Sequence, residues 1–243
     1  MTTTRSLRDE VRNVLDYLSD AELTLYTNAV SMSETRVAWH AHQQHAEFLI
    51  TRQHTYEQYL NWVESGSYSA ILRDASLLQI SYEVRGGKIV AHRLAYVPCP
   101  CIISQDALDA FLGEGSSISD IVNLNEYARD VVFRSPIRFD YDTANAKPGH
   151  PASHMTINSP ECRIACVAPM HVLRFVDFVY RHFYPRLWSA HATFFAEAAW
   201  RHIDARGIVN DELTHIHLAW DTRATATTAP PTHRGARGIR SYR

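Results

Sequence analysis

The sequence predicts an α+β fold, a single domain in which helices at both ends of the chain flank a largely antiparallel sheet. Residues 77–97 contain two strand-like runs joined by a Gly-Gly turn, which is typical of a hairpin. Residues 137–167 contain three further short runs, and the first two alternate with period two. Near the chain ends, in residues 6–18 and 170–184, apolar residues recur at helical spacing instead.

The N-terminal part of the chain is predicted to contain three helices and one strand. Residues 6–18 place five apolar side chains on one helical stripe, with Ser6 as the candidate N-cap. A second short helix is predicted over residues 20–30 and a strand over residues 35–41. The third helix is expected over residues 56–64.

The central hairpin is the clearest element. Its strands are predicted over residues 77–82 and 89–97, and the Gly86-Gly87 pair suits a turn that needs positive φ. A short helix is predicted over residues 107–112 and ends at glycine. For residues 118–133 the sequence does not distinguish helix from loop.

The elements after residue 135 run from strands to helices. Strands are predicted over residues 137–142, 153–158 and 163–167. Helices are predicted over residues 170–184 and 187–203, and a final strand over residues 213–220. Pro185 is expected to separate the two helices, because proline interrupts the helical hydrogen-bond pattern.

The domain is predicted to span residues 1–221, followed by a disordered basic tail over residues 222–243 that has too few apolar residues to form a core. Five of the 24 basic residues lie in this tail, which leaves 19 bases against 26 acids, a formal charge of −7, before it. An acidic body argues against broad binding to duplex nucleic acid, since phosphate contacts dominate that affinity. The acidic net charge does not exclude a local basic site.

The sequence contains no run of eighteen apolar residues, so no membrane-spanning helix is expected. The N-terminus mixes charges into its helical pattern and lacks the apolar core of a signal peptide. We therefore expect a cytoplasmic protein with no membrane partner.

The candidate site lies on the strands after residue 135. Period-two alternation places Arg138 and Asp140 on one strand face, and His154 on the corresponding face of the next strand. His150 lies in the Pro-Gly-His-Pro loop between them, and Arg163 begins the third strand. Arg138, Asp140, His150 and His154 are predicted to lie close together on one face of the sheet, and Arg163 is a candidate second phosphate ligand.

One chemistry that these residue types could perform is metal-independent cleavage of RNA. Such cleavage needs a base for the 2′-hydroxyl, an acid for the leaving oxygen and a cation for the developing phosphorane charge. His150 and His154 could supply the base and the acid, while Arg138 and Arg163 could bind phosphate.

Two other interpretations of the same residues stay open. In the first they are structural: Arg138 and Asp140 form an ion pair on the sheet, and the histidines bond to loop backbone. In the second, Asp140, His150 and His154 bind a metal ion. Four strand residues span about 13 Å, so a metal site requires a loop that folds His150 back towards His154.

Other patterns favour no site. The cysteines at 99, 101, 162 and 166 do not have the usual spacing of a zinc knuckle. Arg186 and His191 match the short Arg-x-x-x-x-His pattern of HEPN ribonucleases, but a surface helix pair explains them as well. The His40/His42 and His215/His217 pairs are typical of partly exposed sheet residues.

Five segments carry a family resemblance: residues 77–82, 92–96, 135–141, 150–154 and 182–185. Together they resemble the bacterial family catalogued as domain of unknown function 2290, over about residues 5–220. The resemblance implies no activity and no catalytic residue. It implies a genetic context, because such proteins resemble accessory genes of mobile elements, where defence and toxin–antitoxin components are common.

Two functions from different classes remain open. The first is a nucleic-acid-directed nuclease, the effector of a defence or toxin system, with the five residues at its centre. The second is a non-catalytic module that binds a partner protein or a nucleotide on the same polar face. The sequence does not determine a cofactor, a metal or whether the chain forms a homo-oligomer.

Overall fold

The computed structural model describes residues 2–39, 56–103, 128–131, 134–147, 149–159, 161–205, 207–208 and 211–220. Within these ranges, no helix is both long enough and apolar enough to cross a membrane. The predicted helix over residues 107–112, the His40/His42 pair and the basic tail lie outside them. The predicted domain boundary at residue 221 therefore stays a prediction.

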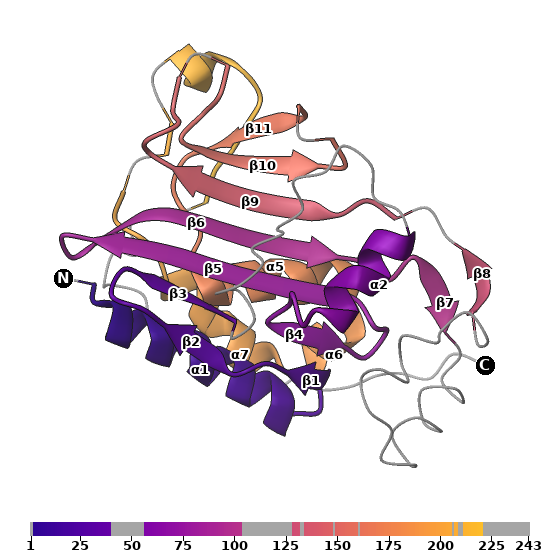
Figure 1. Ribbon diagram of the computed structural model, residues 1–243. Helices are drawn as coiled ribbons and strands as arrows, with labels where there is room; N and C mark the ends of the chain where they lie inside the picture. The colour runs from indigo at the N-terminus through magenta and orange to yellow at the C-terminus, as the bar shows by residue number, and fades with distance from the viewer. Residues whose placement is uncertain are drawn as a thin grey trace, which may run out of the picture.

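One large sheet organises the molecule (Figure 1). Its strands are β1 (Thr24–Thr27), β2 (Val30–Met32), β3 (Arg36–Trp39), β4 (Ala70–Leu72), β5 (Leu77–Arg85), β6 (Lys88–Val97), β9 (Ile137–Asp142), β10 (Ser153–Ile157), β11 (Arg163–Cys166) and β12 (His217–Leu218). The order is β1-β4-β5-β6-β9-β10-β11-β12, with the β2–β3 hairpin beside β5. All described pairings are antiparallel except β11–β12. A separate pair consists of β7 (Cys101–Ile103) and β8 (Ala128–Val131).

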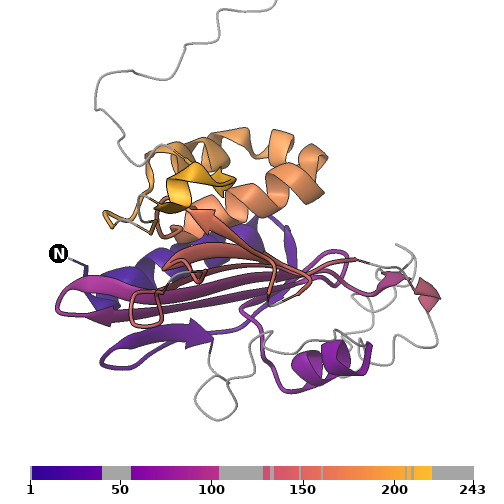
Figure 2. The ribbon, with the colours of Figure 1, turned by 90° about the horizontal axis from the view of Figure 1, so that it is seen from above.

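Helices from both ends of the chain cover one face of this sheet (Figure 2). The helical elements are α1 (Thr4–Asp20), α2 (Tyr56–Glu64), α5 (Val172–Phe183), α6 (Pro185–Ala190), α7 (Ala192–Ala196) and the 3₁₀ turns η3 (Glu197–Trp200) and η4 (Asp211–Thr214). Helix α2 lies on the opposite side of the sheet (Figure 2). The predicted α+β fold, with a largely antiparallel sheet and helices at both chain ends, is confirmed.

The main core lies between the sheet and the helices α1 and α5. All five apolar residues of the predicted N-terminal stripe are buried there. From the sheet, the ring of Phe139 packs against Phe175 and Phe178, with centroid distances of 6.3 and 5.1 Å. Burying an aromatic ring of this kind stabilises a fold by about 1.5–3 kcal/mol. One face of the strands is thereby committed to the core.

The opposite face changes character along the strands. Near α2 it is apolar, because Leu77, Ala95 and Val97 pack against Tyr59 and Trp62 of that helix and its neighbours. Two to six residues further along the same strand faces, the positions are polar: Ser81 and Glu83 on β5 and Arg93 on β6. The polar part of this face carries the candidate site.

Two predictions near the N-terminus are wrong in detail. Helix α1 begins at Thr4 and is capped by Thr3, while Ser6 is the reciprocal partner in the capping box. The helix predicted over residues 20–30 does not form. Instead Glu22 adopts a positive φ of 53° after α1, and β1 pairs with β4. This pairing partner lies more than 40 residues away, so local periodicity could not show it.

The C-terminal predictions also need correction. The helix predicted over residues 187–203 is divided into α6, α7 and η3, because His191 adopts φ −112° and bonds through Nδ1 to the Tyr17 hydroxyl at 3.0 Å. The strand predicted over residues 213–220 is reduced to β12, which pairs in parallel with the short strand β11. The preceding residues form η4 instead.

Candidate functional site: an arginine-lined groove

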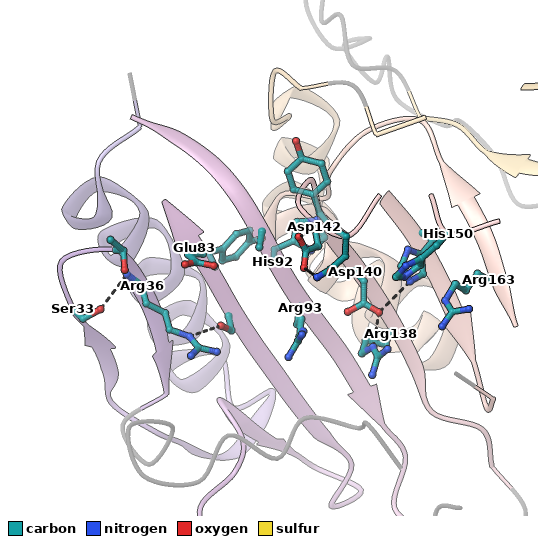
Figure 3. Close-up of a pocket in the computed structure, with 17 residues that line it drawn as sticks. Ser33, Arg36, Glu83, His92, Arg93, Arg138, Asp140, Asp142, His150 and Arg163 are labelled. Atoms are coloured by element: carbon teal, nitrogen blue, oxygen red, sulfur yellow. Dashed lines mark hydrogen bonds and ion pairs between the residues drawn. The ribbon is translucent and has the colours of Figure 1, made fainter. Parts of the chain in front are cut away.

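A groove of about 620 Å³ lies on the sheet face away from α1 and α5 (Figure 3). All five predicted site residues line it: Arg138, Asp140, His150, His154 and Arg163. The structure therefore brings the predicted set together, although this placement alone assigns no activity. We call this cavity the arginine groove.

Strand register explains why these side chains meet. Arg93 on β6, Asp140 on β9 and His154 on β10 are direct neighbours across the sheet. In the adjacent row, Arg138 on β9 pairs with Thr156 on β10, which pairs with Arg163 on β11. Directly paired residues point to the same face of a sheet, so two rows of polar side chains line the groove.

Asp140 joins the two rows. Its Oδ2 accepts a hydrogen bond from Arg138 Nε at 2.6 Å and lies 3.5 Å from His154 Nε2. The side chains of Arg138, Asp140 and His154 are only 15, 9 and 5% exposed. A charged pair with so little water around it is strongly coupled, because screening is weak there. Asp140 thus holds Arg138 at the floor of the groove.

His154 is held through one of its ring nitrogens. Its Nδ1 lies 2.9 Å from the carbonyl oxygen of Pro151, and because a carbonyl only accepts, Nδ1 carries a proton. Burial lowers the pKa of His154, and this effect exceeds the opposing attraction of Asp140. The charges of His150 and Arg163 lower the pKa further. The neutral form therefore dominates at pH 7, and in this form Nε2 carries no proton to donate to Asp140.

The loop before β10 folds His150 back towards His154. Lys147 and His150 exchange two backbone hydrogen bonds, of 3.1 and 2.8 Å, and Gly149 between them adopts a positive φ of 74°. The two imidazole rings are consequently 5.0 Å apart between centroids. The fold-back that a metal site requires is present. Nevertheless, within the described part of the chain no three His, Cys, Asp or Glu side chains are arranged to hold a metal ion.

Both features of the structural interpretation are also present. Arg138 and Asp140 form the expected ion pair, and His154 bonds to the backbone of its loop. Because its ring is buried and bonded through Nδ1, His154 is better suited to a structural role than to exchanging protons with a ligand. His150 is half-buried, and Arg163 is exposed. Arg163 is therefore the most accessible member of the predicted set, and His150 is the more accessible of its two histidines.

Sequence reasoning missed two further arginines, Arg36 on β3 and Arg93 on β6. Alternation along each strand could have shown on which face of that strand each arginine lies. Only the pairing of β3 with β5, β5 with β6 and β6 with β9 shows that this face is the one that carries Arg138. Arg36 is half-buried, and burial together with the nearby charge of Arg93 lowers its pKa. Glu83 offsets this only in part. Positive charge is therefore concentrated in this part of the groove.

The remaining sequence patterns give no second site in the described residues. His191 of the Arg-x-x-x-x-His pattern is engaged by Tyr17 of α1. All four cysteines are free thiols, and burial raises the pKa of Cys99 to about 11, so this thiol stays protonated at pH 7. In the His215/His217 pair, His217 Nδ1 is hydrogen-bonded to the backbone carbonyl of His215 at 2.9 Å.

Comparison with known proteins places the chain in a family. The model of the family described as "Uncharacterized conserved protein (DUF2290)" matches residues 20–220, which covers nearly all of the described structure. No curated protein and no solved structure matches the chain. The matched range includes every strand of the main sheet and every residue that lines the arginine groove. The chain therefore belongs to the DUF2290 family of uncharacterised conserved proteins.

Proposed function

We propose that the arginine groove binds a strand of nucleic acid through its phosphates. The observation that carries this proposal is the row of four arginines, Arg36, Arg93, Arg138 and Arg163, supplied by four different strands of one sheet (Figure 3). In this view their guanidinium ends point towards the same edge of the groove. Guanidinium groups bind phosphate oxygens through paired, charge-assisted hydrogen bonds.

The length of the row favours a strand over a single nucleotide. Strands β3 and β11 are five sheet positions apart, and neighbouring strands are about 4.8 Å apart, which gives about 24 Å between the outer arginine backbones. One phosphate contacts guanidinium nitrogens at about 2.8 Å. It can therefore engage one or two of these arginines, and occupying the row takes several phosphates in succession.

The groove is suited to the backbone of the strand more than to its bases. The ring of Tyr82 extends to the helix side of the sheet, where its hydroxyl donates to the carbonyl of Met170 at 2.9 Å. His92 also faces that side and accepts a hydrogen bond from Met170 N. These rings do not form a stacking platform in the groove. Binding through phosphate and sugar would give little sequence preference.

The acidic charge of the body is compatible with this proposal. Glu83, Asp140 and Asp142 also line the groove, but Asp140 is already paired with Arg138. Burial lowers the pKa of Arg36, and the positive charge of Arg93 lowers it further, as expected for two like charges that repel one another. A bound phosphate would relieve this repulsion, whereas a duplex would bring its second strand against the acidic body.

We expect Arg163→Gln to weaken the binding of a single-stranded oligonucleotide about fivefold at low salt and to reduce the salt slope by about 0.7. Arg163 suits this test because it is exposed, so its replacement should leave the fold intact. Fluorescence anisotropy over a series of salt concentrations measures both quantities.

The matched control for that experiment is Arg12→Gln, which removes another exposed arginine, from helix α1 on the covered side of the sheet. The control should bind like the unchanged protein. Equal losses for the two variants, or binding without salt dependence, would contradict a phosphate site in the groove.

Cleavage of the bound strand is the second candidate function, favoured by the presence of the half-buried His150 and the exposed Arg163 in the lining of the same groove. In this reaction a base takes the proton of a 2′-hydroxyl, the 2′-oxygen attacks phosphorus, and the 5′-oxygen leaves with a proton from an acid. His150, the more accessible ring, would exchange these protons, and Arg163 would face the developing phosphorane charge. Such an activity suits an effector of a bacterial defence or toxin–antitoxin system.

If the protein cleaves RNA, His150→Ala should lower the single-turnover rate about 100-fold while oligonucleotide binding is retained. Gel analysis of a labelled RNA, compared with the same strand carrying 2′-deoxyribose throughout, measures the rate. Binding without cleavage in the unchanged protein would assign the groove to a non-catalytic module. Equal cleavage of RNA and deoxy strands would exclude attack by the 2′-oxygen.

A further inference from the structure

A second cavity adjoins the arginine groove and has a different lining. Its volume is about 800 Å³, and its walls come from the loop between β9 and β10, from β11 and from the segment around η4. Figure 1 shows this C-terminal segment at the top of the molecule beside the β9–β10 loop. Six lining residues are apolar or proline: Ala146, Pro151, Ala152, Ala165, Ile208 and Ile216.

The wall that closes this cavity is held tightly to the sheet. Gly207 donates a hydrogen bond to the carbonyl of Val167 and accepts one from the backbone N–H of Ser153, both at 2.9 Å. A Cβ atom at position 207 would lie only 2.3 Å from Ser153 Cβ, so the segment packs more closely than any other residue would allow. The neighbouring Ile208 is thereby fixed as a buried wall residue.

His150 and Arg163 line both cavities. A phosphate held between these two side chains would therefore lie at the boundary, and any group bonded to it could enter the second cavity. In a nucleic-acid strand that group is a nucleoside, with an apolar base face and polar base edges. Apolar walls with a few polar groups, here Lys147, Glu212 and His215, are typical of sites for such ligands.

We infer that the second cavity binds the base of a terminal nucleotide of the strand whose phosphates occupy the arginine groove. The inference rests on the proposed binding function and adds a subsite to it. Ile216 is the most accessible apolar contact, because its side chain lies at the cavity while 89% of the residue remains exposed. A base stacked against it would remove this apolar surface from water. The protein would then prefer the end of a strand to its interior.

Competition anisotropy with short thymidine oligonucleotides tests this subsite. The competitors are the intact strand and two strands of equal charge that lack the base at the 5′ or the 3′ terminal nucleotide. We expect one of the two abasic strands to bind about tenfold more weakly than the intact strand, which corresponds to about 1.4 kcal/mol. The phosphate contacts are the same in all three.

The variant Ile216→Ser should remove most of the difference in affinity between the intact and the abasic strand, because it should weaken the binding of the intact strand alone. Leu213→Ser is the matched control, since Leu213 is exposed on the same segment but does not line the cavity. Equal affinity of all three strands, with Arg163→Gln still weakening each of them, would overturn the base subsite and leave the proposed function standing. Absence of binding by every strand would overturn both.

Discussion

Replacing Asp140 by Ala is expected to lower the free energy of unfolding by about 3–5 kcal/mol, because it leaves a buried guanidinium without its carboxylate partner. Asp140 Oδ2 lies 2.6 Å from Arg138 Nε, and the two side chains are 9 and 15% exposed. Urea unfolding followed by circular dichroism measures the loss. The same change should also disorder the floor of the arginine groove, since Asp140 holds Arg138 there.

The double variant Arg138→Met/Asp140→Leu separates the effect of an unpaired charge from the effect of altered packing. Removing both members of a buried pair is often neutral or stabilising, so the double variant should regain most of the stability lost in Asp140→Ala. A double variant as unstable as the single one would show that packing, and not charge pairing, is what Asp140 contributes. Oligonucleotide affinity should fall in both, because each disrupts Arg138.

Acidification from pH 7 to pH 4.5 is expected to lower the free energy of unfolding, with about 3 kcal/mol of the loss due to His92. This histidine is buried, and its Nε2 accepts a hydrogen bond from the backbone N–H of Met170 at 2.8 Å. Protonation at Nε2 would break that bond. Burial lowers the pKa of His92 from 6.5 to about 3.

The direction of the effect follows from the two pKa values. The unfolded chain takes up a proton near pH 6.5, whereas the folded protein resists protonation down to about pH 3. Stability from the neutral ring is therefore complete above pH 6.5 and is lost as the pH falls from there towards 3. His92→Gln, which keeps an acceptor near Met170, should flatten the curve of unfolding free energy against pH. The exposed His182→Gln should leave the slope unchanged, and equal slopes for all three proteins would contradict the assignment.

Elements with a strong local pattern could be predicted closely from the sequence. The hairpin of β5 and β6, the strand β9 and the helix α2 have the predicted positions, because alternation and turn residues act within a few positions of one another. Residues 20–30 and 213–220 were predicted wrongly, because in each case the structure depends on a distant partner, β4 for the first and β11 for the second. Propensity is a weak guide where tertiary pairing decides.

The residues of the candidate site also divide into those that the local pattern predicts and those that it does not. The period-two face of β9 and the loop at His150 were sufficient to predict that Arg138, Asp140, His150 and His154 would lie close together, and all four line one cavity with Arg163. Arg36 and Arg93 were missed, because they come from strands of the first hundred residues whose order in the sheet has no local signature. Whether the assembled residues bind a strand or also cleave it is what the oligonucleotide experiments measure.

By itself the sequence determined the α+β class, the identity of the strands around the site and the face on which the polar residues of β9 and β10 lie. These properties depend on side-chain period, which is local. Only the tertiary structure decided that β3 and β6 extend this face with two more arginines, that His154 is held by the Pro151 carbonyl, and that an apolar cavity adjoins His150 and Arg163. Each of these depends on contacts between segments far apart in the chain, and such contacts follow from the packing of the whole sheet.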